Sequence, residues 1–155
     1  MKLQKRLLVA AAIVAAATVV GAQSDPTIGT WKLNLAKSKY SAGEPPKSST
    51  VVIEPAGQGI KLTATTVIAD GSTRRITYTA SYDGKDAVVT GTPDYNGMSL
   101  KKVGGAVEGS RKKDGKTVQT YTRTVSADGK TMTVKASGTT ASGQRIESTQ
   151  VYDKQ

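Results

Sequence analysis

The sequence of 155 residues contains no cysteine and no histidine. Without cysteine, no disulfide can stabilise the fold, and the thiol nucleophile is excluded. Without histidine, the side chain that most often serves as a general acid or base near neutral pH is missing, and so is the commonest metal ligand. We therefore expect a protein that is not an enzyme and that has neither a metal site nor a cofactor.

Carboxylates offer little to replace the missing groups. Asp70, Asp83, Asp114 and Asp128 each precede a glycine, and Asp is expected in such turns because it bonds to nearby backbone amides. Glu147 alternates with apolar residues and so belongs to the solvent side of its segment. No pair of carboxylates is therefore predicted to perform acid–base catalysis.

The first residues have the pattern of a secretory signal peptide. Lys2, Lys5 and Arg6 precede an apolar run, 7–20, which is broken only by Thr18, and small residues follow up to Ala22. This pattern predicts cleavage after Ala22. The run is shorter than the roughly 20 residues that span a bilayer, so we expect an exported mature chain, 23–155, without a transmembrane span, in the periplasm or outside the cell.

Turn signals divide the rest of the chain at short intervals. Asp-Gly or Asn-Gly occurs at 70–71, 83–84, 96–97, 114–115 and 128–129, with Gly-Gly at 104–105 and Ser-Gly at 142–143. Asp-Gly and Asn-Gly supply the positive φ of tight hairpin turns. We predict ten strands and no substantial helix, over 28–35, 49–55, 59–69, 73–82, 86–91, 98–103, 106–113, 116–125, 130–139 and 144–153.

Between the turns, apolar and polar residues alternate. Ile60, Leu62 and Ala64 share one face of their segment, and Ile76, Tyr78 and Ala80 share one face of the next. A period of two indicates strands with one buried face and one solvated face. The strand at 116–125 is ambiguous, because its apolar residues fall on opposite faces.

The predicted fold is therefore all-β, an antiparallel up-and-down meander of about eight to ten strands. A long meander with one apolar face must close or leave its edge strands open to aggregation. Closure into a barrel is the favoured architecture, and a two-sheet sandwich is the alternative. The connection at 36–48, which contains Pro45-Pro46, is either a cover over one mouth of the barrel or a plain surface loop.

The two ends of this region resemble the calycin superfamily, which comprises the lipocalins and the fatty-acid-binding proteins. Gly29-Thr30-Trp31 resembles the Gly-x-Trp motif of the first calycin strand, and the segment 148–154, Ser-Thr-Gln-Val-Tyr-Asp-Lys, resembles the last strand of a fatty-acid-binding protein. The resemblance implies a single lipocalin-like barrel domain of the small exported bacterial type. It assigns structural roles to Gly29 and Trp31, with Trp31 closing one end of the barrel.

The chain also departs from these families. The connection at 36–48 is too short for the two-helix lid of a fatty-acid-binding protein. Gln150 stands where those proteins carry the arginine that holds the ligand carboxylate, although Tyr152 is kept. The segment Thr92-Pro93-Asp94-Tyr95 only approximates the second lipocalin motif.

The barrel interior suggests the function. Phe is absent and Trp31 is the single tryptophan, so the inward side chains are small for a barrel of this size, and either a cavity remains or the barrel flattens until its walls meet. A cavity would make the protein a non-catalytic binder of a small hydrophobic or amphipathic ligand. The polar side chains expected to bind that ligand are Tyr78, Tyr82, Gln150 and Tyr152, joined by Tyr121 and Arg123 if strand 116–125 turns that side inward.

The positive charge gives the alternative function. Removing the signal segment lowers the formal net charge from +10 to +7, and Lys101, Lys102, Lys116 and the run 111–113 could form a basic patch near one hairpin. A filled barrel could use this patch to engage envelope partners or to associate weakly with anionic surfaces. Aromatic residues do not alternate with these cations, so nucleic-acid binding is not expected. We expect a monomer.

Overall fold

The computed structural model describes residues 24–139 and 143–155, which form a closed antiparallel β-barrel. The proposed signal segment and Ser142 of the Ser-Gly turn lie outside the described residues. The barrel strands are β1 (Gly29–Leu33), β3 (Ser48–Ala56), β4 (Gly59–Val67), β5 (Thr73–Ser81), β6 (Ala87–Thr90), β7 (Gly97–Val103), β8 (Ala106–Lys113), β9 (Lys116–Val125), β10 (Thr131–Thr139) and β11 (Arg145–Lys154).

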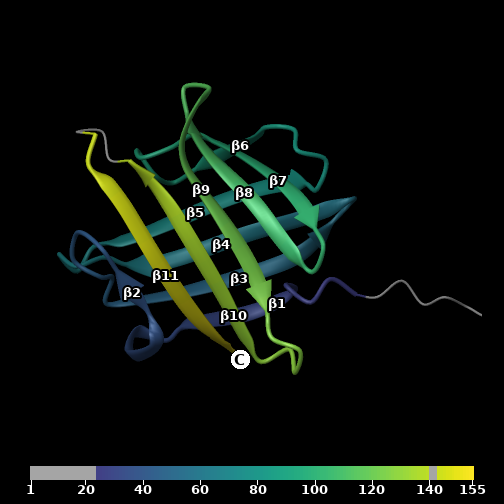
Figure 1. Cartoon of the computed structure of the whole chain (residues 1–155), viewed down its shortest axis with the longest axis horizontal. Coiled ribbons are helices and arrows are strands. Elements are labelled where there is room, and N and C mark those ends of the chain that lie inside the picture. Colours follow the sequence, from purple (N-terminus) through teal and green to yellow (C-terminus); the bar gives the residue numbers. More distant parts are fainter. Residues whose placement is uncertain (1–23, 140–142) are drawn as a thin grey trace, which may run out of the picture.

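Each barrel strand pairs with the next along the chain, and β1 pairs with β11 to close the ring. Trp31 lies opposite Lys154 and Leu33 lies opposite Tyr152 in that closing register. In Figure 1 the strands β8 to β11 cross in front of β3, β4 and β5, as expected when strands tilt around a barrel. The predicted all-β meander and its closure are confirmed, and the two-sheet sandwich is excluded.

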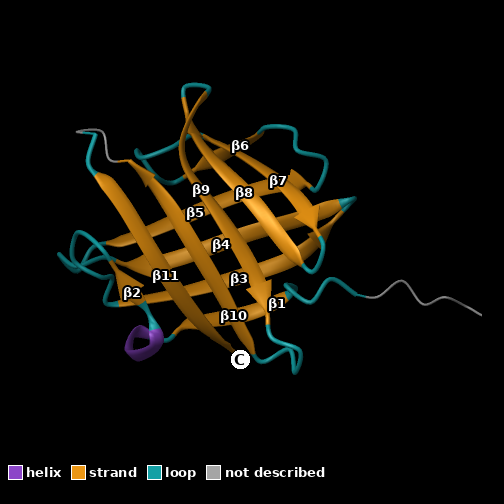
Figure 2. Cartoon of the chain, viewed as in Figure 1, coloured by secondary structure: helices purple, strands orange, loops and turns teal. Residues whose placement is uncertain are grey.

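The connection after β1 is more ordered than the sequence suggested. It contains a single 3-10 turn, η1 (Leu35–Lys37), and a two-residue strand, β2 (Lys39–Tyr40). Figure 2 shows this turn as the helical segment beside β2. The side chain of Asn34 caps the turn by accepting a hydrogen bond from the backbone N–H of Lys37, and β2 then pairs with β11 at Ser148 and Thr149. The predicted first strand, 28–35, therefore ends early, at Leu33. Asn34 begins the 3-10 turn, and the chain pairs with β11 again at β2.

Alternation along the strands places the apolar faces inside. The buried hydrophobic residues come from every barrel strand. The Gly residues of the 70–71 and 128–129 turns have φ of 92° and 70°, as tight Asp-Gly turns require. The predicted turn at Asn96-Gly97 is wrong in detail, because Gly97 begins β7 and the side chain of Asn96 instead bonds to Asp114 at 2.8 Å.

The ambiguous strand contains a β-bulge. Arg111 lies opposite Gln119, but Lys112 lies opposite Thr117, so Val118 is the extra residue of β9. A bulge changes which face the following residues occupy. Beyond it, Tyr121 and Arg123 are buried inside the barrel, and the parity of 119–123 differs from that of Lys116 and Thr117.

One end of the barrel is filled with apolar side chains. Trp31, Ile60 and Leu100 have no exposed surface, and Ile53 is 1 % exposed. The indole N–H of Trp31 donates to the carbonyl oxygen of Thr27 at 2.8 Å, and the ammonium of Lys154 lies 5.1 Å from the ring centroid. Trp31 is thus buried at the end of the barrel where the resemblance implies that it has a structural role.

Candidate functional site

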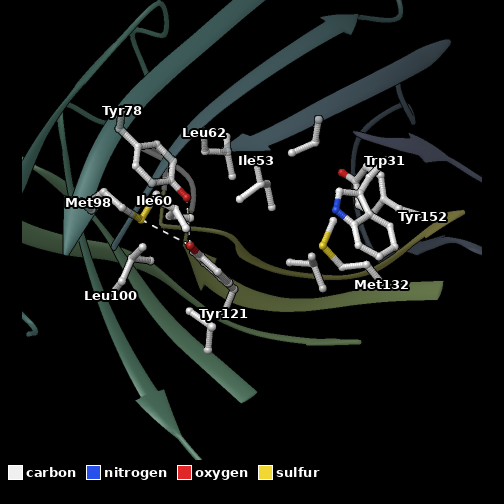
Figure 3. Packing of buried hydrophobic residues seen from close by; sticks show 14 of the residues in the cluster. Trp31, Ile53, Ile60, Leu62, Tyr78, Met98, Leu100, Tyr121, Met132 and Tyr152 are labelled. Atoms are coloured by element: carbon white, nitrogen blue, oxygen red, sulfur yellow. Dashed lines mark hydrogen bonds between the residues drawn. The ribbon is translucent and has the colours of Figure 1, made fainter. Parts of the chain in front are cut away.

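The other half of the barrel encloses a cavity of about 210 Å³. Figure 3 shows residues from the opposite walls of the interior, with Tyr78 and Tyr121 pointing toward one another. Pro46, from the connection before β3, and Tyr95, from the loop before β7, border the cavity at the end away from Trp31. The expectation that 36–48 contributes to one mouth of the barrel is therefore met by Pro46.

The cavity is lined by apolar and polar residues in equal number, and the polar groups converge on one space, as they do in ligand sites. The apolar residues are Leu33, Pro46, Val51, Leu62, Ala64, Ile76, Met98, Met132 and Val134. The polar residues are Ser49, Thr66, Tyr78, Tyr95, Arg111, Tyr121, Arg123, Gln150 and Tyr152. No Asp or Glu is among the residues that line it.

Two tyrosines meet across the interior. The hydroxyl oxygens of Tyr78 and Tyr121 lie 3.4 Å apart, and the Tyr121 hydroxyl also contacts the sulfur of Met98 at 3.7 Å. Gly109 makes this position possible, because a Cβ there would overlap the Tyr121 ring. Burial raises the pKa of Tyr78 well above its usual value, so its hydroxyl stays neutral and can donate a hydrogen bond at physiological pH.

Arg123 supplies a buried positive charge beside these tyrosines. The residue is only 2 % exposed, and its Nε and Nη2 atoms have no hydrogen-bond partner among the described residues. None of the ion pairs in the described part of the chain includes it. Nε and Nη2 form one side of the guanidinium fork, the side that can hold both oxygens of a carboxylate.

Arg111 also faces the interior, although the sequence analysis placed it in a surface patch. Its guanidinium carbon lies 5.2 Å from the ring centroid of Tyr95 and 5.2 Å from that of Tyr121. Its Nη1 donates to the side-chain oxygen of Gln119, and its Nε is buried without a partner in the described structure. The residues Val107, Gly109 and Arg111 share one face of β8, and this alternation could have identified Arg111 from the sequence.

The last strand contributes a neutral polar pair. The Tyr152 hydroxyl donates to the side-chain oxygen of Gln150 at 3.1 Å, and burial raises the pKa of Tyr152 to about 12. Ser49 and Thr66 share a hydrogen bond of 2.8 Å on the facing wall. Gln150 thus occupies the cavity where the resemblance leads one to expect an arginine, and the positive charges come from β8 and β9 instead.

Five of the six residues predicted to bind the ligand line one cavity: Tyr78, Tyr121, Arg123, Gln150 and Tyr152. The sequence analysis missed Tyr95, Met98 and Arg111. Met98 lies two residues before Leu100 and so shares its inward face of β7, which means that alternation could have identified it. Tyr95 lies in a loop, where alternation gives no information.

Tyr82 is the exception, because it does not line the cavity. Its hydroxyl donates to Asp25 at 2.5 Å, and the ammonium of Lys102 lies 4.4 Å from its ring centroid and 3.2 Å from the Asp25 carboxylate. Asp25 also accepts hydrogen bonds from the backbone and hydroxyl of Thr27. Tyr82 lies just after the end of β5, and there it fixes the segment that precedes β1.

The predicted basic patch is not a single cluster. Lys101 lies opposite Glu108 near one end of the β7–β8 hairpin, whereas Lys113 lies opposite Lys116 at the far end of β8. Arg111 points into the barrel, and Lys112 forms an ion pair with Asp86 at 2.6 Å. The strands are extended, so lysines that are close in sequence are separated along their length.

A larger hollow lies on the outside of β8 to β11. This groove of about 750 Å³ is bordered by Ser, Thr, Lys and Glu side chains of the solvated strand faces, among them Glu108, Thr122, Lys135 and Glu147. It has none of the unpaired buried charges of the interior cavity. Within 24–139 and 143–155, no three acidic side chains gather in a way that could hold a metal ion, and no helix is long and apolar enough to cross a membrane.

Comparison with known proteins gives a fold and no family. No family model matches the chain, and no curated protein matches it. Among solved structures, the wild-type fluorescent protein UnaG is 14% identical, with a TM-score of 0.52, 86% of this chain covered and 100% of that chain. The zebrafish ileal bile-acid-binding protein complexed with cholic acid is 12% identical, with a TM-score of 0.49, over 84% of this chain and 99% of that one.

A third solved structure, the siderocalin Ex-FABP, is 10% identical, with a TM-score of 0.39, over 85% of this chain and 75% of that one. At these identities the likeness concerns the fold alone. The likeness to UnaG, together with the closed antiparallel order of ten strands, shows the barrel fold that the calycin resemblance predicts.

Proposed function

We propose, on the premise of a calycin-type barrel, that this protein binds a small amphipathic ligand inside the barrel and performs no chemistry on it. The observation that carries the proposal is the interior cavity of about 210 Å³, lined by apolar residues and a convergent polar set. Pockets for drug-sized ligands start at about 300 Å³. The ligand is therefore small, or it projects beyond the cavity.

The charge balance of the cavity indicates which polar group the ligand carries. Arg123 presents Nε and Nη2 without a partner, and the lining contains no carboxylate. A buried cation without a counter-ion is costly, on the order of 3–5 kcal/mol. A ligand with an anionic end would supply the missing counter-ion, and the hydroxyls of Tyr78 and Tyr121, which line the same cavity, are available to add hydrogen bonds.

Isothermal titration calorimetry with octanoate and with octanol, its neutral counterpart, tests this proposal. We expect saturable binding of octanoate at one site per chain. Octanol should bind about tenfold or more weakly, because hydrogen bonds to charged groups contribute roughly 1.5–3 kcal/mol. No saturable binding of either compound would contradict the proposal.

A cavity-filling variant shows whether binding occurs inside the barrel. Ala64 lines the cavity on β4, whereas the next residue, Thr65, belongs to the opposite face of the same strand. Ala64→Leu should abolish octanoate binding while the protein remains folded, and Thr65→Leu is the matched control that should leave binding unchanged. Equal binding by both variants would place the ligand elsewhere.

We also propose that the protein acts outside the cytoplasm, after removal of its first residues. The support is the sequence pattern of a basic start, an apolar run and small residues before Gln23. Intact-mass measurement of the protein recovered from its native cells should give a chain that begins at Gln23. A chain that retains residues 1–22 in the cytoplasm would overturn this proposal.

A further inference from the structure

We propose that the ligand carries a second anionic group, bound by Arg111 toward the end of the cavity that Pro46 and Tyr95 border. This inference rests on the proposed function, because it describes the same cavity. Two observations support it: the surroundings of the Arg111 guanidinium, and the position of Arg111 relative to Arg123.

The environment of Arg111 leaves its Nε as the buried donor that still needs an acceptor. Tyr95 and Tyr121 each lie with a ring centroid 5.2 Å from the guanidinium carbon. These rings cover part of the guanidinium surface, and Nη1 already donates to Gln119. The buried Nε remains without a partner in the described structure. Because Arg111 lines the cavity, a ligand there can bring an acceptor to Nε, and N–H donors of a guanidinium bind the oxygens of a carboxylate well.

The surroundings supply no counter-ion to Arg111. The cavity lining contains no Asp or Glu, and none of the ion pairs between described residues includes Arg111. Its neighbour Lys112, on the outer face of the same strand, does have such a partner in Asp86, at 2.6 Å. The cation on the outside is paired, and the cation on the inside is not.

The two inward arginines lie too far apart along the barrel to act as one clamp by their backbone positions. Arg123 lies opposite Val107, and Arg111 is four residues further along β8. At a rise of roughly 3.3 Å per residue, their positions are about 13 Å apart. Tyr121 lies between them on β9, with Tyr78 across the interior. Two guanidinium groups with unpaired nitrogens, on side chains that start about 13 Å apart along the barrel, suit one elongated ligand with an acidic group near each end.

The test compares octanedioate with octanoate by calorimetry at neutral pH. A second carboxylate makes a ligand better solvated and would weaken binding to a cavity with one cationic site. With a second site at Arg111, octanedioate should bind about tenfold more tightly than octanoate, the gain expected for one added charge-assisted contact. Octanedioate binding no more tightly than octanoate would overturn the inference.

Two variants assign the gain to Arg111. In Arg111→Met, the ratio of octanedioate to octanoate affinity should fall to one or below, because the side chain keeps an unbranched apolar stem and loses the charged guanidinium. In Lys112→Met, which removes the same charge from the outer face, the ratio should stay at its wild-type value. A ratio that falls equally in both variants would mean general attraction of a dianion to a basic protein, and would overturn the inference.

The experiment distinguishes failure of this inference from failure of the proposed function. Binding of octanoate without any preference for octanedioate removes the second anionic site and leaves the proposed function intact. No binding of octanoate, octanedioate or octanol removes both. If Arg111→Met does not fold, the wild-type comparison at low and at raised salt decides, since a contact with a buried guanidinium is screened much less than surface attraction.

Discussion

At the scale of single residues, Gly109 controls the shape of the cavity. Any side chain at this position would overlap the ring of Tyr121, which lies against the backbone of β8 and reaches toward Tyr78. Gly109→Ala should destabilise the protein by about 1–3 kcal/mol, as overpacking of a core does. It should also weaken octanoate binding, because the displaced ring enters the cavity.

Gly105→Ala is the matched control for this prediction. Gly105 lies in the β7–β8 turn, without positive φ, and a Cβ there meets nothing within 4 Å. Thermal unfolding of the two variants should separate them clearly. If Gly109→Ala unfolds at the same temperature as Gly105→Ala, the contact between β8 and the Tyr121 ring is not a constraint.

Asp25 gives the fold a defined response to acid. Burial alone would raise the pKa of its carboxyl group, but hydrogen bonds from Tyr82 and Thr27 and the Lys102 ammonium outweigh it and lower the pKa to about 2. Because the folded-state pKa lies below the usual 3.8, this stabilisation is complete above about pH 4 and is lost as the pH falls toward 2.

Asp25→Asn should therefore cost about 1–2 kcal/mol of unfolding free energy at pH 7, a value reduced for partial exposure, with a smaller cost near pH 2. Denaturant unfolding at several pH values measures both. Asp86→Asn, which changes an exposed ion pair, should stay within about 0.5 kcal/mol of the wild type. A cost for Asp25→Asn that does not vary between pH 7 and 2 would contradict the ionised hydrogen-bonded carboxylate.

At the scale of elements, most strands could be predicted from the sequence because turn residues and alternation agree. The extent of strand β9 could be predicted, but not which of its residues face the interior. The bulge at Val118 changes the alternation of inward and outward residues along the strand. The bulge also depends on Gly138 of the neighbouring strand, where a Cβ would overlap the backbone of Val118. That contact is between strands, and no pattern within 116–125 contains it.

The same limit applies to the loops that border the cavity. Tyr95 and Pro46 come from irregular segments, and their place at the open end follows from how the strands are ordered around the barrel. The sequence suggested a cover over one mouth from the length of 36–48 and its proline pair. It could not show that Tyr95 would contact Arg111, because that contact joins a loop to β8.

Strand β6 is the weakest part of the closed sheet. It shares two residue pairs with β5 and two with β7, whereas β10 shares nine with β11. Segments with few backbone hydrogen bonds open at low free energy. Amide hydrogen exchange should therefore be faster in β6 than in β10, and equal protection of the two strands would contradict this account of the barrel's stability.

At the scale of the whole molecule, barrel closure could be predicted because an open meander would leave exposed edges. The presence of a cavity could be predicted only as one of two outcomes, since small inward side chains also allow a flattened barrel. The structure divides the interior instead. Apolar side chains surround Trp31 at one end, and a hollow lined by Arg111 and Arg123 remains in the interior.

If the ligand lies within this hollow, nuclear Overhauser contacts should join octanoate to assigned methyl groups of the cavity lining. The methyl groups of Met98 and Met132 belong to cavity-lining residues, whereas Val88 on β6 is 77% exposed. We predict contacts from the octanoate chain to Met98 and Met132 and none to Val88. Contacts to Val88 alone, or contacts to neither methionine under saturating octanoate, would contradict binding inside the barrel.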